Sequence, residues 1–276
     1  MHFAYRSKSF DIEGVSQNDH IYRKISRTGT FYEIDLLEYI YWIKPLIYSK
    51  GCKNVVIDIG ANIGNHSVFL CSFLADHLIA IEPNPNVLFQ LRRNLSKNIS
   101  NYTIIECAVS DKESRGTIVV PENTNDNIGS AKVNVNINEG DIKISTVDSI
   151  FSSWKDKVDN PVSVSLIKID VEGMELQALK GAENTILKYK PHIFAEAATK
   201  QEFQRIHNYL LFLGYRKMPG HWAGTPVYHF AYNPTFALIA AAHFCIVRRP
   251  AKNIMSSLKR RLKRRFTGGG HLEGVR

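Results

Sequence analysis

The chain has 276 residues, 44% of them hydrophobic, which is enough for one α/β domain with a sizeable core and excludes a disordered protein. Its four cysteines lack the spacing of a metal site, and no basic-then-apolar signal peptide opens the sequence, so we expect a reducing, cytoplasmic location. The net charge of +9 comes from the C-terminal end, because residues 1–247 hold 25 basic and 25 acidic residues.

The first predicted elements lead into a glycine-containing turn. Residues 1–30 are polar and irregular, and we expect an extended or poorly ordered N-terminal arm. Apolar side chains at near-helical spacing predict a helix over residues 35–48. Residues 55–59 form an apolar run broken by one acid, which is typical of a strand buried on both faces. A turn at residues 60–64 and a helix at 65–74 follow.

The alternation of strands and helices continues to residue 232. It predicts a doubly wound, mostly parallel α/β sheet with helices on both faces. The expected organisation is a single domain over residues 31–247, preceded by the arm 1–30 and followed by a basic tail, 248–276. The further predicted strands are 78–81, 103–109, 164–169 and 192–195, with short pieces at 116–120 and 131–135 and a closing hairpin of 215–218 and 227–232. The further predicted helices are 86–95, 175–189 and 201–213.

The turn after the first strand is the expected ligand site, because doubly wound sheets bind ligands at the carboxyl ends of their strands. Gly60 and Gly64 let the backbone approach a ligand, and the next helix offers free N–H groups. Asp58 is costly in an apolar strand unless it is paired, so it holds the loop or reaches a ligand ammonium through water. The predicted cofactor-binding residues of this segment are Asp58, Gly60, Ala61, Asn62, Gly64 and Asn65.

A second predicted ligand contact closes the next strand. Glu82 follows Gly60 by twenty-two residues, a place where an acid accepts hydrogen bonds from both ribose hydroxyls. The alternative is that Glu82, beside Pro83, only caps the next helix. Asn62 replaces the glycine that lets a dinucleotide's pyrophosphate approach, and no Gly-Lys-Ser/Thr phosphate loop is present. The remaining candidate is a ligand with an adenosine and no phosphates, which describes S-adenosylmethionine.

Four segments in order resemble the FkbM family of methyltransferases. They read VIDIGANIGNHS at 56–67, AIEPNP at 80–85, AVSD at 108–111 and IKIDVEGME at 167–175. The resemblance implies a Rossmann-like methyltransferase fold with strand order 3-2-1-4-5-7-6 and an antiparallel seventh strand. It also implies O-methylation of a hydroxyl on a glycan or secondary-metabolite acceptor. In that fold the loop after the third strand frames the adenine, which points to Cys107 and Ala108.

Methyl transfer to a neutral hydroxyl needs a group that removes the proton, and acids cluster after the fourth core strand. Asp170 ends that strand, and Glu172 and Glu175 follow across Gly173. We expect Asp170 and Glu172 to be catalytic, while the alternative for Glu175 is a charge facing the helix dipole. Glu196, which ends the fifth strand, is a third catalytic candidate, with a salt bridge at the sheet edge as its alternative. Binding of a divalent cation is the alternative for these closely spaced acids, but no His–His or His–acid pair has obvious metal-binding spacing, so no metal site is predicted.

Three further features border the expected site. Glu33 is a candidate to close over the cofactor, although most such acids are simply solvated. His66 either contacts the ligand or caps the helix that it begins. Residues 127–131 lie between the third and fourth core strands and form a candidate substrate lid.

The C-terminal tail is strongly basic. Between Arg248 and Arg265 the chain has nine basic residues and no acidic ones. Apolar side chains recur every four residues from Ile254 to Phe266, so a helix here would be amphipathic. Such a segment, residues 248–266, is suited to an anionic membrane surface. Nucleic acid or an acidic partner would fit it equally well, and a solvated, disordered tail is the further alternative.

Two other functions remain as hypotheses. One is a nucleic-acid methyltransferase that uses the basic tail, although the charge lies outside the fold and no Asn/Asp-Pro-Pro-Tyr/Phe motif follows the fourth strand. The other is a non-catalytic membrane adaptor with the same fold, against which the intact acids Asp58, Glu82 and Asp170 argue. The leading hypothesis is an S-adenosylmethionine-dependent O-methyltransferase acting on a small molecule or glycan.

Overall fold

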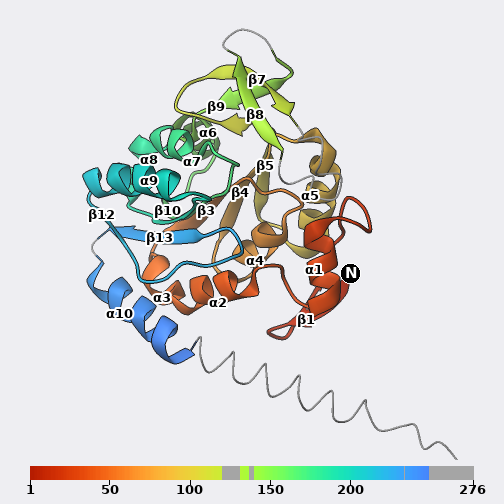
Figure 1. The fold of residues 1–276 in the computed structure, drawn as a ribbon, viewed down its shortest axis with the longest axis horizontal. Coiled ribbons are helices and arrows are strands. Elements are labelled where there is room, and N and C mark those ends of the chain that lie inside the picture. The colour runs from red at the N-terminus through yellow and green to blue at the C-terminus, as the bar shows by residue number, and fades with distance from the viewer. Residues whose placement is uncertain (120–130, 137–139, 233, 249–276) are drawn as a thin grey trace, which may run out of the picture.

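The computed structural model describes residues 1–119, 131–136, 140–232 and 234–248 (Figure 1). Its centre is a seven-stranded sheet in which neighbouring strands are parallel, except that β13 runs antiparallel to both its neighbours. Numbered along the chain, these strands have the predicted order 3-2-1-4-5-7-6. From the β5 edge they are β5 (Tyr102–Ile105), β4 (His77–Ile81), β3 (Lys53–Ile59), β10 (Val162–Ile169), β11 (His192–Glu196), β13 (Val227–Tyr232) and β12 (Tyr215–Lys217).

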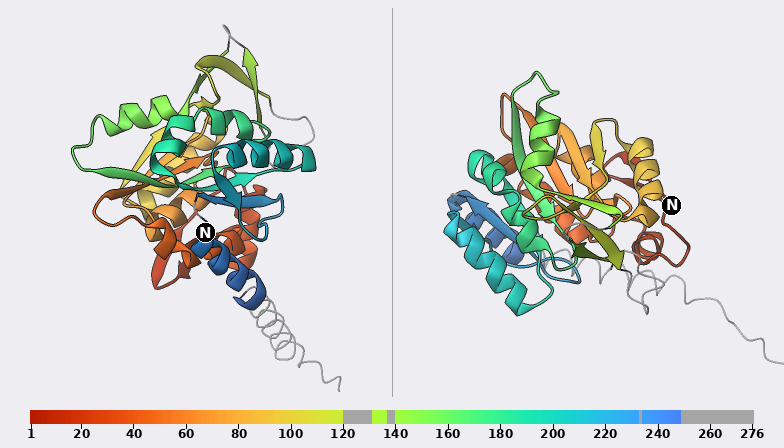
Figure 2. Two further views of the ribbon diagram at one scale, coloured as in Figure 1. Left: turned by 90° about the vertical axis from the view of Figure 1, so that its left-hand side faces the viewer. Right: turned by 90° about the horizontal axis from the view of Figure 1, so that it is seen from above.

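Helices cover both faces of this sheet and enclose two apolar cores (Figure 2). Val56 belongs to one core and its neighbours Val55 and Ile57 to the other, because successive strand side chains point to opposite faces. The first core is covered by α2 (Ile34–Trp42), α3 (Lys44–Ile47), α4 (Asn65–Phe73), α5 (Pro85–Asn98) and α10 (Thr235–His243). The second is covered by α6 (Val147–Lys155), α7 (Glu175–Lys180), α8 (Glu183–Tyr189) and α9 (Lys200–Phe212).

The N-terminal thirty residues are not the extended arm that their polarity predicted. They form a hairpin of β1 (His2–Tyr5) and β2 (Lys8–Asp11), followed by α1 (His20–Thr28). Phe3 and Phe10 are buried in the first core, with their rings against Phe31. A hairpin that buries only alternate side chains shows few apolar residues in sequence, which is why the polar composition was misleading.

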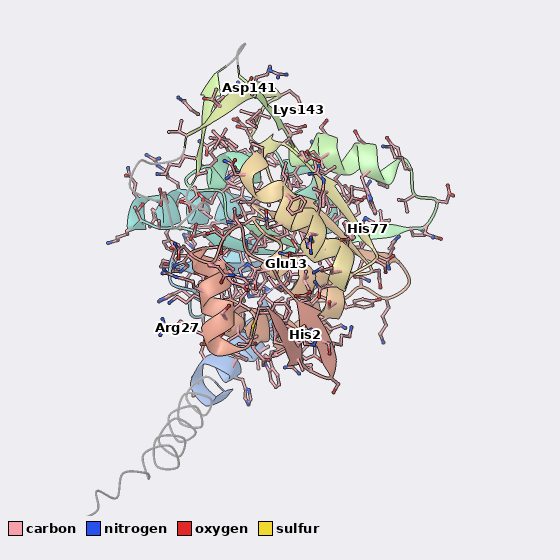
Figure 3. All side chains as sticks on the ribbon, turned by 90° about the vertical axis from the view of Figure 1, so that its right-hand side faces the viewer. His2, Glu13, Arg27, His77, Asp141 and Lys143 are labelled. Atoms are coloured by element: carbon pink, nitrogen blue, oxygen red, sulfur yellow. The ribbon has the colours of Figure 1, made fainter. Side chains whose placement is uncertain are left out.

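The N-terminal segment is tied to α5 by polar contacts as well. Glu13, which Figure 3 labels, accepts from Arg93 Nε at 2.7 Å and from Lys97 Nζ at 2.6 Å. The side chain of Asn94 bonds both the N–H and the carbonyl of Glu13. These contacts fix the segment beside the helix that follows β4, and so beside the expected ligand site.

A second, four-stranded sheet is inserted between β5 and β10 and lies at the top of Figure 1. Two of its strands match the short pieces predicted at residues 116–120 and 131–135, whereas the strand predicted over 103–109 is divided between β5 and β6. Its strands, in order, are β6 (Ala108–Val109), β9 (Ile142–Ser145), β7 (Ser114–Val119) and β8 (Lys132–Asn136).

Two long predicted helices are each divided in two. The helix expected over residues 35–48 breaks at Ile43, two residues before Pro45, which has no N–H to continue the ladder. The helix expected over 175–189 breaks near Gly181, where a Cβ would lie 2.0 Å from the carbonyl oxygen of Ser110.

The predictions omitted α6 and α10. The amphipathic segment predicted at 248–266 lies outside the described residues beyond Arg248.

Candidate active site

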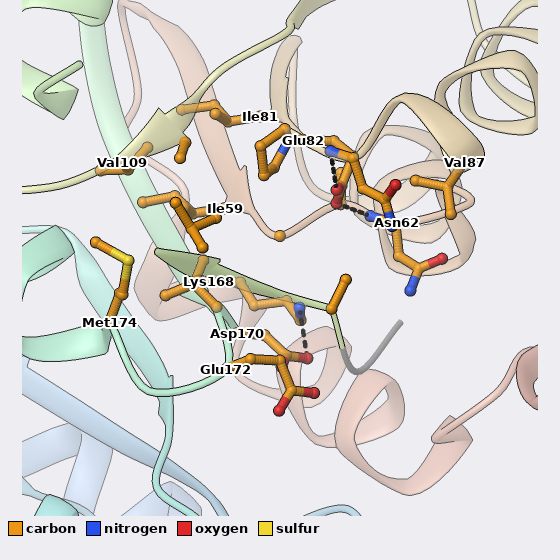
Figure 4. A pocket seen from close by; sticks show the side chains of 18 of the residues that line it. Ile59, Asn62, Ile81, Glu82, Val87, Val109, Lys168, Asp170, Glu172 and Met174 are labelled. Carbon is orange, nitrogen blue, oxygen red and sulfur yellow. Dashed lines mark hydrogen bonds and ion pairs between the residues drawn. The ribbon is translucent and has the colours of Figure 1, made fainter. Parts of the chain in front are cut away.

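A cleft opens at the carboxyl ends of β3, β4 and β10 (Figure 4). It encloses about 920 Å³ including its mouth, which suits a small organic ligand. The strand ends, the N-terminal segment and the inserted sheet all contribute to its wall. The lining residues are Ile21, Tyr32, Ile59, Gly60, Ala61, Asn62, Asn65, His66, Ile81, Glu82, Pro83, Asn84, Val87, Cys107, Ala108, Val109, Ile118, Ala131, Val133, Lys168, Asp170, Val171, Glu172 and Met174.

The loop after β3 turns sharply because Gly60 and Gly64 adopt positive φ angles of 79° and 85°. A Cβ on Gly60 would lie 1.8 Å from the backbone oxygen of Asp170, so glycine here allows the two loops to meet. Gly64 caps α4 and packs against Leu91 and Leu95 of α5. It does not line the cleft, so close packing of α4 on α5 is a second reason for glycine here, beside the predicted ligand contact.

Glu82 is held at the end of β4 by two backbone N–H groups. Asn62 N donates to its Oε2 at 2.8 Å, and Asn84 N donates to its Oε1 at 2.9 Å. The helix that follows is capped by Asn84 itself, which accepts from Asn86 N. Burial raises the pKa of Glu82 to about 7. A carboxylate has about four acceptor sites, so two remain for hydroxyl groups of a ligand in the cleft.

Asp58 and Lys168 form an opposite-charge pair inside the sheet. They are direct neighbours in the register of β3 and β10, with Lys168 Nζ 3.5 Å from Asp58 Oδ1. Asp58 also accepts from Ser67 Oγ at 2.6 Å, which ties the strand to α4. Asp58 is fully buried and does not line the cleft. Its contacts therefore join β3 to β10 and α4, and both predicted roles of Asp58, holding the loop or reaching a ligand ammonium through water, stay predictions.

Lys168 connects this buried pair to the cleft. Its Nζ lies 3.2 Å from Asp170 Oδ2, while its side chain is only 3% exposed. Burial opposes the ammonium charge, but Asp170 and Asp58 outweigh it and raise the pKa of Lys168. In return Lys168 lowers the pKa of Asp170 in spite of burial. Asp170 therefore carries a fixed negative charge on the cleft wall.

The other two predicted catalytic acids lie near Asp170. Glu172 lines the cleft in a left-handed backbone conformation with φ of 50°, and burial and Asp170 raise its pKa. Glu196 does not line the cleft. Burial and then the neighbouring charge of Asp170, to which it is hydrogen-bonded, raise the pKa of Glu196 to about 9. Glu196 is thus protonated at neutral pH and donates a hydrogen bond to the Asp170 carboxylate.

Tyr32, Glu33 and His66 lie together where the residues just before α2 meet the start of α4. The Tyr32 and His66 rings stack at 6.4 Å, and both residues line the cleft. Glu33 lies behind them with its Oε2 3.5 Å from His66 Nε2, and burial raises the pKa of Glu33 to about 7. Burial lowers the pKa of His66 to about 3, so the ring is neutral.

Most of the predicted site residues meet in this cleft. Those that line it are Gly60, Ala61, Asn62, Asn65, Glu82, Pro83, Cys107, Ala108, Asp170 and Glu172. Three predicted site residues, Asp58, Gly64 and Glu196, do not line it. Of the expected lid at residues 127–131, only Ala131 is described, and it lines the cleft.

The predictions missed Lys168 and the apolar wall made by the inserted sheet. Lys168 had a visible signal, because it is the one charged residue of β10, just as Asp58 is the one acid of β3. Ile118 and Val133 line the cleft from β7 and β8. Nothing in their local sequence indicates this, because only the packing of the inserted sheet brings them to the strand ends.

The described residues contain neither a metal-binding cluster nor a helix that could span a membrane. No group of three or more His, Cys, Asp or Glu side chains among them has an arrangement that would hold a metal ion. Within the same ranges, every helix is too short or too polar to cross a membrane.

The strand order, the glycine loop and the acid at the end of β4 together define a Rossmann-like methyltransferase fold. The methyltransferase FkbM domain matches residues 58–217, which is more than half of the chain. The chain therefore belongs to the FkbM methyltransferase family.

The chain is similar to several known proteins. The chain is 32% identical over 144 residues to the hexuronic acid methyltransferase AglP of Haloferax volcanii, a match over 52% of this chain and 56% of that relative, so it spans about half of the relative's length. The crystal structure of an FkbM methyltransferase from Methylobacillus flagellatus is 21% identical with a TM-score of 0.45, over 69% of this chain and 47% of that one. The N-terminal domain of human METTL16 in complex with SAH is 16% identical with a TM-score of 0.41, over 71% and 68% of the two chains.

Proposed function

We propose that this protein is an S-adenosylmethionine-dependent O-methyltransferase that acts on a hydroxyl of a glycan. The observation that carries the proposal is the cleft itself, with the anchored carboxylate of Glu82 on one side and Asp170 and Glu172 on the other. The family membership and the hexuronic acid methyltransferase relative support the reaction class and a sugar acceptor.

The residues present fit this cofactor. Glu82 has free acceptor sites for two ribose hydroxyls, and Cys107 and Ala108 supply an apolar wall for the adenine. The loop at Gly60 and Ala61 and the charge of Asp170 would border its amino-acid end and sulfonium. When bound, S-adenosylmethionine supplies a methyl group that is already activated for in-line displacement.

The chain's own task is then to position the acceptor hydroxyl and to take its proton. Among the three predicted catalytic acids, Glu172 best suits a proton acceptor. It lines the cleft, its pKa is raised, and no described residue hydrogen-bonds its side chain. Asp170 is held as an anion by Lys168, which makes it a weaker base but a stable partner for a cationic cofactor. Glu196 keeps its proton at neutral pH and would position Asp170.

Calorimetry with S-adenosylmethionine and with its demethylated product tests the cofactor. We expect the protein to bind both compounds. If it binds neither compound, the proposal is overturned. Transfer of a radiolabelled methyl group to a panel of uronic acid and neutral glycosides then tests the acceptor class. Binding of the cofactor with transfer only to nucleic acid would refute the glycan assignment.

The Glu172→Gln variant tests the base. We expect kcat to fall by roughly 10²-fold or more, since general-base catalysis contributes about that much. Affinity for the demethylated product should not change, because Glu172 acts on the acceptor. An unchanged kcat would assign the proton transfer to another residue.

A further inference from the structure

The last described helix is apolar on the side that faces away from the protein. Helix α10 continues into a π-helical turn, η2 (Phe244–Arg248). The side chains buried against the first core are Ala237 and Ala241 of α10 and Phe244 of η2. Phe236, Ile239 and Ile246 point outward and are 73%, 64% and 72% exposed. In Figure 1 the helix lies at the periphery of the fold, with its outer side uncovered.

This exposure is unusual for a surface helix. Residues 235–246 include no Asp, Glu, Lys or Arg, so α10 lacks the charged outer face that surface helices normally have. Several large apolar side chains gathered on one exposed face mark a surface that binds something. Neither the cleft nor its lining residues include any part of α10, so the proposed function does not account for this face.

The sequence after α10 indicates which kind of partner binds this exposed apolar face. Nine basic residues and no acidic ones lie between Arg248 and Arg265, directly after the exposed apolar positions. The rest of the chain is balanced in charge, so this segment alone sets the electrostatic attraction. Apolar side chains next to a dense run of Lys and Arg are the combination that binds an anionic lipid surface.

A second copy of the chain fits this face less well than an anionic membrane does. Two copies would each carry nine positive charges in the sequence directly after this face, and their repulsion would oppose the small apolar contact. An anionic membrane neutralises the same charges and also buries Phe236, Ile239 and Ile246. We propose that the outer face of α10 and η2 docks the protein on an anionic membrane surface, with these three side chains inserted at the lipid interface.

Vesicle co-sedimentation of the full chain tests the proposal. The probes are phosphatidylcholine vesicles with and without roughly a third phosphatidylglycerol, at low and at raised salt. We expect binding to the anionic vesicles only, weakened by salt. Failure to bind anionic vesicles at low salt would overturn the proposal.

Two variants separate the apolar contribution from charge alone. The triple variant Phe236→Ser, Ile239→Ser and Ile246→Ser should bind anionic vesicles at least about tenfold more weakly while keeping its melting temperature. The matched control Phe89→Ser and Phe212→Ser removes side chains that are 63% and 84% exposed on α5 and α9, and it should bind as the parent does. Equal binding of the triple variant and the parent would refute the role of α10. Light scattering that shows a dimer lost in the triple variant would assign the face to self-association instead.

Discussion

At the scale of single residues, opposite charges inside an apolar sheet decide how the site is held. Asp58 and Lys168 stand side by side in two central strands, and each would be costly there alone. Together with Ser67 they hold β3, α4 and β10 in register. Lys168 also forms an ion pair with Asp170, and this contact holds the Asp170 side chain on the cleft wall.

Glu82 offers a direct test of the ribose contact. Both of its oxygens accept from backbone N–H groups, and an amide has only one acceptor oxygen. In Glu82→Gln one of these N–H groups therefore faces an NH2 group, and the ligand hydroxyls lose an anionic acceptor. We expect binding of the demethylated cofactor to weaken by about 1–3 kcal/mol in calorimetry. Asp159→Asn, an exposed acid away from the cleft, should bind normally, and an unchanged affinity in Glu82→Gln would remove the ribose role.

Glu196 makes stability depend on pH. Its pKa is about 9 in the folded protein against an ordinary value of 4.5, because burial and Asp170 disfavour its charge. The folded state thus holds a proton that the unfolded chain releases, so this stabilisation is complete below about pH 4.5 and is lost as pH rises toward about 9.

Glu196→Gln keeps the neutral hydrogen-bonding group at every pH. We expect the variant to be about 1–2 kcal/mol more stable than the parent at alkaline pH and nearly equal at acidic pH. Melting temperatures across this pH range measure the difference. Glu106→Gln, a carboxylate that is 46% exposed, should follow the parent curve, and parallel curves for Glu196→Gln would contradict the raised pKa.

At the scale of elements, the turn after β3 depends on how closely two loops approach. A Cβ on Gly60 meets the carbonyl oxygen of Asp170 at 1.8 Å, and the residue has a φ of 79°. Gly51 has a similar φ of 81° with nothing within 4 Å of the added atom. Alanine would therefore strain the left-handed backbone at both positions, but only at Gly60 would its Cβ also collide with another part of the backbone.

Alanine at each of these positions separates the two effects. We expect Gly51→Ala to lower the free energy of unfolding by about 1–2 kcal/mol, the cost of left-handed backbone alone. Gly60→Ala should lower it by about 3–5 kcal/mol, because backbone must also move. Urea denaturation compares them, and equal losses would show that the loops do not need the close approach. Gly60→Ala should also weaken cofactor binding.

At the scale of the whole molecule, the N-terminal hairpin is part of the domain. Phe10 is 2% exposed and packs its ring against Phe31 and Phe73. Phe10→Ala should therefore lower the free energy of unfolding by about 3–5 kcal/mol. Phe212→Ala, at an 84% exposed position, should change it by less than about 0.5 kcal/mol. Similar small effects of both variants in urea denaturation would mean that the hairpin does not stabilise the domain.

The sequence by itself determined the alternation of strands and helices, the order of the sheet through a family resemblance, and the half of the site built on local motifs. Gly60, Asn62 and Glu82 could be predicted because turn chemistry and the end of a buried strand are encoded within a few residues. Asp170 and Glu172 followed for the same reason, since they come directly after β10.

Only the tertiary structure decided which residues share the cleft. It paired Lys168 with Asp58 across two strands, placed Glu196 behind Asp170, and brought Tyr32 and Ile118 to the wall from distant segments. These contacts depend on long-range packing that no local pattern specifies. The N-terminal hairpin and the uncovered face of α10 have the same origin, because burial of an apolar side chain is decided by its neighbours in space.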